Sequence, residues 1–260
     1  MRAFIREKGF HPAQCQTASG VLEHDEVFIS EFIRQATRAG FHVHLHALSD
    51  KAVRLAMDAF EQSKQSADQQ NLTQSITHAQ LVHPDDVQRL GQLGVYVAFT
   101  YVWMDPDPEY DATTMPFIDE LANLDDLYNP AHYYYQNTYP VRSIMKAGGI
   151  LTWGSDAPVE YRDPRPFENL QIAVTRAAYG EVLNPNETIS IHDALTAFTI
   201  NGARLLGHDK QLGSIEVGKT ADLIVLNQNV VALAESGQAE KIGETLVDLT
   251  IFDGKVIYQR

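Results

Sequence analysis

One unit recurs along this chain: a short apolar strand, a polar residue at its end, and a helix that begins at a capping residue. The unit occurs around His46, and it occurs again where the short strand of residues 72–77 runs into His78. Strands that alternate with helices indicate parallel pairing, because each helix returns the chain to the start of the next strand. We therefore predict an α/β fold.

Residues 150–158, ILTWGSDAP, contain a third strand end. A short apolar run leads to Asp156, and Pro158 prevents further strand pairing. In parallel α/β barrels the catalytic residues lie at the carboxyl ends of the strands, where the loops converge on one mouth. Asp156 is therefore a candidate catalytic residue, although this stretch alone is equally compatible with an N-cap or turn aspartate.

Residues 41–46, FHVHLH, alternate between apolar side chains and histidines. A period of two indicates a strand whose three imidazoles share one face. In a barrel the apolar face packs on the outer helices and the histidine face points into the lumen, with His46 nearest the catalytic mouth. We interpret His42 and His44 as polar residues that bind nothing, as most histidines do.

The step from His46 to His78 matches one barrel unit of about 30 residues, and the step to Asp156 suits two enlarged units. Two imidazoles and a carboxylate are donors that a catalytic zinc uses while it keeps one position open for water. Such a metal lowers the pKa of bound water from about 15.7 to about 7, and a neighbouring carboxylate accepts the proton. With ten histidines in the chain, this spacing is suggestive by itself and no more.

A long connection, residues 101–138, follows the predicted strand of residues 95–100 and is rich in Asp, Pro and Tyr. Long ordered connections after barrel strands usually cover the substrate, so we predict a lid that contains one short helix at residues 117–124. The alternative is an insertion without a role in the site, or an oligomer contact.

Capping residues predict where several helices begin and end. Asp25 should begin a helix that Gly40 ends, and Asp50 should begin another. Residues 63–71 are polar and are expected to form a loop.

The chain changes character after residue 207. Short apolar runs separated by glycines predict strands, and the pair Asp253-Gly254 predicts a hairpin turn. We therefore place a partial barrel at residues 1–207 and a small β-domain at residues 208–260.

The composition restricts the partners of the protein. A formal net charge of −14 argues against nucleic acid or an anionic membrane as a partner. Cys15 is the single cysteine, which excludes an internal disulfide and a thiolate zinc cluster. No apolar run reaches the ~20 residues of a membrane span, and residues 1–10 lack the apolar segment of a secretory signal. A cytoplasmic location is predicted for the chain as it stands.

Four stretches of the chain, taken together and in order, carry a resemblance to a known family. They are HLHALSDKAVRLAMDAFE (44–61), THAQLVHPDDVQRLGQLGV (77–95), GGILTWGSDAPVEYRDPRPF (148–167), and LTAFTINGARLLG with GSIEVGKTADLIVL (195–226). The chain resembles the metal-dependent amidohydrolase superfamily, and within it the amidohydrolase-3 group.

The resemblance implies a role for each candidate residue. His46 and His78 would be metal ligands at the tips of the fifth and sixth barrel strands, and Asp156 would be ligand and general base at the eighth. It implies one or two divalent metal ions, zinc by expectation, and a metal-bound hydroxide that hydrolyses carbon–nitrogen bonds of small non-peptide or cyclic amides. The segment 213–226 resembles part of the family's β-sandwich, in which Lys219 and Asp222 are read as structural.

The chain also departs from the family pattern. The first-strand His-x-His and the fourth-strand lysine are absent, and His42-Val43-His44 lies on the fifth-strand segment instead. Four barrel strands are counted, whereas a closed barrel of this type needs eight.

We therefore expect the C-terminal half of a TIM-type (β/α)8 barrel followed by part of a small β-sandwich. A second copy in a homodimer, a separate chain or a missing N-terminal half would complete it. The alternative function is a catalytically inactive fragment that serves as a regulatory or interaction module.

Overall fold

The computed structural model describes residues 24–159 and 162–260. Cys15 and residues 1–10 lie outside these ranges. Within the ranges, no helix combines the length and the apolar character that crossing a bilayer requires.

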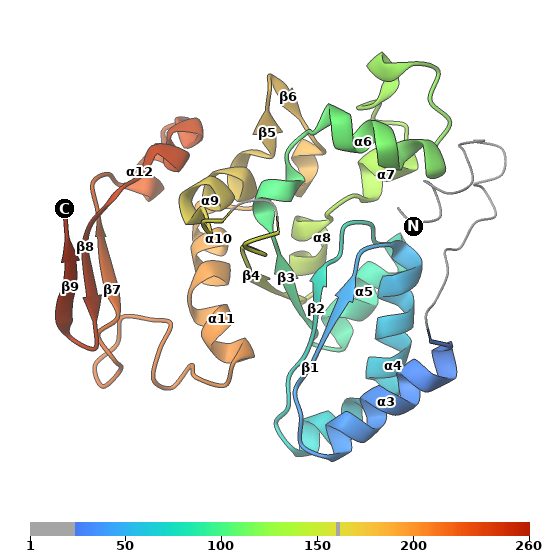
Figure 1. The fold of residues 1–260 in the computed structure, drawn as a ribbon, viewed down its shortest axis with the longest axis horizontal. Helices are drawn as coiled ribbons and strands as arrows, with labels where there is room; N and C mark the ends of the chain where they lie inside the picture. Colours follow the sequence, from blue (N-terminus) through green and yellow to red (C-terminus); the bar gives the residue numbers. More distant parts are fainter. Residues whose placement is uncertain (1–23, 160–161) are drawn as a thin grey trace.

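Four parallel strands form the central sheet in the order β1-β2-β3-β4 (Figure 1). They span Val43–Ala47 (β1), Gln74–His78 (β2), Tyr96–Phe99 (β3) and Ile150–Trp153 (β4). Each strand is joined to the next through at least one helix, which is the crossover that parallel pairing requires. The predicted α/β fold with parallel strands is confirmed.

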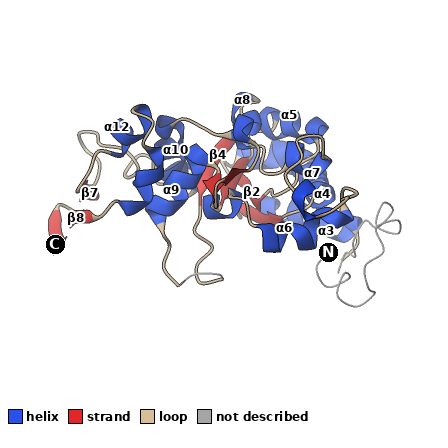
Figure 2. Ribbon diagram, turned by 90° about the horizontal axis from the view of Figure 1, so that it is seen from above, coloured by secondary structure: helices blue, strands red, loops and turns tan. Residues whose placement is uncertain are grey.

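Helices precede, connect and follow these strands, and in Figure 2 α5 and α8 lie along one side of the sheet. The α-helices outside the long connection are α3 (Glu26–Arg38), α4 (Asp50–Gln69), α5 (Pro84–Gln92), α8 (Val141–Lys146), α9 (Pro166–Thr175), α10 (Ile191–Phe198), α11 (Ile200–Leu205) and α12 (Val230–Glu235). Leu45, Ile76, Val97 and Leu151 are neighbours in register across the four strands and pack in one core. This row of apolar side chains anchors the strands whose ends carry the candidate residues.

The predicted start of the first helix is confirmed. Asp25 is the N-cap of α3 and accepts a hydrogen bond from the Phe28 backbone N–H at 2.7 Å. Gly40 follows the helix with a left-handed φ of 87°, which suits a terminating glycine.

Two expectations for α4 were wrong. Ser49, not Asp50, is the N-cap, and its Oγ accepts from the Ala52 backbone N–H at 3.3 Å. Residues 63–71 are mostly helical, since α4 continues to Gln69. The polar composition of these residues gave no sign that this part of the helix has a buried face. Ser63 lies on that face, and its hydroxyl donates to the Ala59 carbonyl at 3.0 Å.

The long connection, residues 101–138, lies beyond the arrowheads of β1 and β2 in Figure 1. It contains η1 (Tyr101–Met104), α6 (Pro108–Thr114), η2 (Met115–Phe117), η3 (Leu124–Asp126) and α7 (Tyr133–Asn137). The expected helix at residues 117–124 was therefore misplaced. Met115, Leu127 and Tyr134 form a small core with Leu81, separate from the main core, so the connection is an ordered substructure.

The last part of the chain forms a second, antiparallel sheet in the order β7-β8-β9 at one edge of the molecule (Figure 1). Its strands span Leu223–Leu226 (β7), Val247–Phe252 (β8) and Lys255–Gln259 (β9), and the remaining short elements are β5 (Ala177–Ala178), β6 (Glu181–Val182), η4 (Pro185–Glu187) and η5 (Ala239–Glu244). The hairpin predicted at Asp253-Gly254 is confirmed, with both residues at positive φ. Val230 of α12 and Ile242 of η5 belong to the main core. The region after residue 207 therefore also packs against the region of the parallel sheet.

Candidate active site

The ends of β1 and β2 bring two of the predicted residues together. His46 Nδ1 lies 2.9 Å from His78 Nε2, and the two ring centroids are 4.9 Å apart. His46 is exposed, whereas His78 is only 5% exposed. Two imidazole nitrogens that converge on one point are suitable donors for a divalent metal ion.

Strand register alone would not produce this contact. His46 pairs with Thr77, so regular alternation would place the next side chain, His78, on the opposite face of the sheet. His78 has a left-handed φ of 76° and Ala79 one of 43°, and this turn ends the alternation and lets the imidazole meet His46. Positive φ at non-glycine residues is costly and concentrates at functional sites.

The surroundings of His78 favour its neutral form. Burial lowers the pKa of His78, nearby His46 lowers it further, and Asp156 acts in the opposite direction. Neutral imidazole is the form that binds metal. The Nδ1 atom of His78 is buried and has no hydrogen-bond partner within the described ranges.

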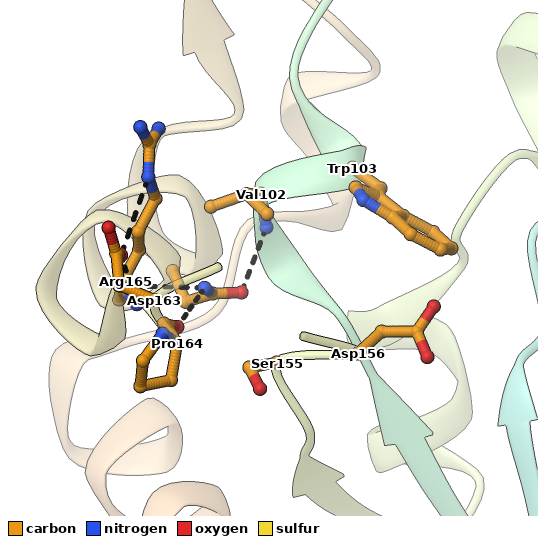
Figure 3. Close-up of a pocket in the computed structure, with 8 residues that line it drawn as sticks. Val102, Trp103, Ser155, Asp156, Asp163, Pro164 and Arg165 are labelled. Atoms are coloured by element: carbon orange, nitrogen blue, oxygen red, sulfur yellow. Dashed lines mark hydrogen bonds and ion pairs between the residues drawn. The ribbon is translucent and has the colours of Figure 1, made fainter. Parts of the chain in front are cut away.

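Asp156 lies in the turn after β4, at a left-handed φ of 53°. It borders a cavity of about 10 Å³, and in Figure 3 its carboxylate lies below the Trp103 ring. The cavity is lined by Val102, Trp103, Ser155, Asp156, Asp163, Pro164, Arg165 and Asn169. The next helix, α9, has Arg165 as its N-cap, so Asp156 is not a helix cap.

The three predicted residues are only partly assembled. His46 and His78 meet, and Asp156 is near enough to act on the charge of His78. Among the residues that the structure describes, no group of three or more His, Cys, Asp or Glu side chains is arranged to hold a metal ion. The donors present fit two ligands of a metal, and a catalytic zinc requires about three from the protein.

The other two histidines of β1 have hydrogen-bond partners on the neighbouring segment. His42 Nδ1 lies 2.8 Å from Thr73 Oγ1, and His44 Nδ1 lies 2.7 Å from Ser75 Oγ. Burial lowers the pKa of His44, and His46 adds to this effect. These contacts are consistent with the interpretation of His42 and His44 as polar residues outside the metal site.

Two residues beside the site escaped the sequence analysis. The Trp103 indole stacks on the His78 imidazole, with ring centroids 5.2 Å apart and planes 11° apart. Asn169 accepts from the Val102 N–H at 3.0 Å and donates to the carbonyls of Pro164 and Arg165 at 3.3 and 3.0 Å. The Trp103–His78 stack and the Asn169–Val102 hydrogen bond each join segments that are distant in the chain, so neither has a local sequence signal.

The long connection is tied to the turn that follows His78. Gln80 donates to Tyr134 Oη at 3.3 Å and accepts from Tyr110 Oη at 2.9 Å. Tyr134 in turn donates to Asp111 at 2.9 Å. Burial raises the pKa of Asp111 to about 6, although its hydrogen bonds from tyrosines oppose the shift.

Comparison with known proteins identifies the family of this chain. Residues 5–258 match the model of the "Amidohydrolase family". The chain is 30% identical over 206 residues to the protein LONG AFTER FAR-RED 3 of Arabidopsis thaliana, covering 77% of this chain and 32% of that protein. It is 26% identical over 251 residues to N-substituted formamide deformylase of Arthrobacter pascens, covering 95% and 42%.

The chain is also similar to a solved structure. An uncharacterized metal-dependent hydrolase from Pyrococcus furiosus superposes with a TM-score of 0.56 at 25% identity, covering 79% of this chain and 37% of that one. The chain thus spans less than half the length of each of these three proteins.

Proposed function

The chain belongs to the Amidohydrolase family, and on this premise we propose that it forms part of a metal-dependent hydrolase of carbon–nitrogen bonds. The observation that carries the proposal is the 2.9 Å separation between His46 Nδ1 and His78 Nε2 at two adjacent strand ends. Support for the bond type comes from the deformylase relative, whose name specifies an N-substituted formamide. The substrate class that we propose is small non-peptide or cyclic amides.

In this proposal, His46 Nδ1 and His78 Nε2 hold a divalent cation, zinc by preference, and one or two ions can be present. When bound, the cation supplies Lewis-acid chemistry, which acidifies water and polarises a carbonyl group. The Asp156 carboxylate accepts a proton from water and returns it to the leaving nitrogen. The lid, residues 101–138, covers the substrate and selects it.

The proposed domain organisation explains the missing ligands. Within the described sheet β1 and β4 each have one strand neighbour, and on β4 the Asn201 side chain of α11 donates to the Leu151 carbonyl at 3.0 Å. We assign residues 1–207 to half of a TIM-type barrel and residues 208–260 to part of a β-sandwich. Strands from a second copy or from a further stretch of polypeptide would close the barrel and complete the metal site. A cytoplasmic location stays a prediction.

The test is hydrolysis of a panel of formamides and cyclic amides by the zinc-loaded 260-residue chain and by any longer product of its gene. Asp156→Asn should lower kcat about 10²–10⁴-fold, because the amide cannot take up the proton. Asp85→Asn is the matched control, since Asp85 is an exposed carboxylate on α5 that contacts His83. Equal rates in Asp156→Asn and the parent would remove Asp156 from the mechanism. No hydrolysis by any form would favour the non-catalytic module.

A further inference from the structure

The His78 imidazole lacks the contact that normally fixes a metal ligand. A histidine that binds metal through one nitrogen usually donates its other N–H to a carboxylate, carbonyl or water, which sets the ring orientation. His78 would bind through Nε2, and its Nδ1 is buried without a hydrogen-bond partner in the part of the chain that the structure describes. A packed aromatic neighbour can also restrict the orientation of such a ring.

Trp103 provides such a contact. Its indole lies almost parallel to the His78 imidazole, at an interplanar angle of 11° and a centroid distance of 5.2 Å. Trp103 is partly buried and packs against the main core, so the indole is itself held in place. An aromatic ring stacked on an imidazole restricts rotation of that ring and excludes water from its face.

The position of Trp103 depends on a buried amide from a different element. Asn169 of α9 is 1% exposed, and its Oδ1 accepts the N–H of Val102, the residue before Trp103. Its Nδ2 donates to the carbonyls of Pro164 and Arg165, which line the same cavity. One side chain thus connects the turn that carries Trp103 with the loop that follows Asp156.

We propose that Trp103 is a positioning residue that orients the His78 imidazole for metal binding, and that Asn169 holds Trp103 in that place. The proposal rests on the proposed function, because it requires His78 to be a metal ligand. Trp103 acts through His78, so its removal changes the affinity for metal before it changes any contact with a substrate.

The experiment is a zinc titration of the full 260-residue chain in competition with a chromophoric zinc indicator. Trp103→Leu keeps an apolar side chain but loses the stacked ring, and it should weaken zinc binding about 10-fold or more. Trp103→Phe keeps an aromatic ring and should recover most of that loss. Trp153→Phe is the control, because the second tryptophan of the chain stacks on Phe198.

Asn169→Ala should also weaken zinc binding, because the turn that carries Trp103 loses its anchor. Thermal unfolding of each variant separates this effect from a loss of fold. If Asn169→Ala does not fold, the Leu and Phe variants at Trp103 still decide the question.

The outcomes separate the two proposals. Zinc binding by the parent that Trp103→Leu leaves unchanged would overturn the role of Trp103 and leave the proposed function standing. A Trp103→Phe variant as weak as Trp103→Leu would also overturn it, since the stacked ring would not be the cause. Absence of zinc from the parent and from any longer product of its gene would overturn the proposed function, and the role of Trp103 with it.

Discussion

The apolar residues of the two main sheets differ in their exposure to solvent. In the parallel sheet Ile76 is 0% exposed, and it lies in a row of apolar side chains that the helices of the same chain cover. In the antiparallel sheet Ile257 is 64% exposed, and its neighbours Val256 and Tyr258 are exposed as well. Both sheets contain apolar strand residues, yet those of the antiparallel sheet are left largely exposed by the described residues.

The difference shows which part of the chain can hold a site. A strand end is placed accurately only when the body of the strand is packed, because well-packed interiors do not deform easily. His46, His78 and Asp156 all follow strands of the buried sheet. The antiparallel sheet has no comparable support, and none of its residues takes part in the site.

The largest effect is expected in the parallel sheet. Ile76→Ala should lower the free energy of unfolding by about 2–5 kcal/mol, because it removes buried methyl groups and leaves a cavity. Urea denaturation of parent and variant measures this difference. A loss below about 1 kcal/mol would mean that the sheet is less tightly packed than the structure shows.

An intermediate effect is expected in the long connection, residues 101–138, which has a small core of its own. Asp111 has a pKa raised to about 6, so between pH 4 and 6 the folded protein holds a proton that the unfolded chain releases. Its contribution to stability is therefore greatest at low pH and is lost as pH rises through 6.

The measurement is the free energy of unfolding of the parent minus that of Asp111→Asn, taken at pH 4 and at pH 7. This difference should fall on the order of 2 kcal/mol across the range. The subtraction is needed because the lowered pKa of His78 has the opposite effect on stability. A difference independent of pH would place Asp111 in contact with solvent.

The smallest effect is expected in the antiparallel sheet. Ile257→Ala should change the free energy of unfolding by no more than about 0.5 kcal/mol, because little apolar surface is buried there. The same urea denaturation, on the same chain, gives a direct contrast with Ile76→Ala. A loss as large as that of Ile76→Ala would show that Ile257 is buried in solution. The two sheets would then not differ in burial.

Much of the fold could be predicted because its signals are local. Alternation identified β1, and capping identified the start of α3 at Asp25. The prediction of a loop at residues 63–71 was wrong, because composition does not reveal that Ser63 lies on a buried face of α4. The helix predicted in the long connection was also misplaced, because the helix positions there depend on contacts between segments, such as those that form the small core around Tyr134.

The site was predicted less completely, and for a similar reason. The sequence placed His46 and His78 at neighbouring strand ends, but the left-handed turn at His78 that brings the rings together has no sequence signal of its own. Trp103 and Asn169 were missed because their contacts arise only from the packing of η1 and α9.

The most direct test of the metal site is the zinc content of the purified chain, by elemental analysis, beside its mass by light scattering. The parent should hold about one zinc ion per site, and the mass would show whether two copies complete that site. His46→Ala and His78→Ala should each lose the metal. His44→Ala should retain it, because His44 contacts Ser75 outside the pair. Absence of zinc from the parent and from any longer product of its gene, or equal loss in all three variants, would contradict the assignment of His46 and His78 as metal ligands.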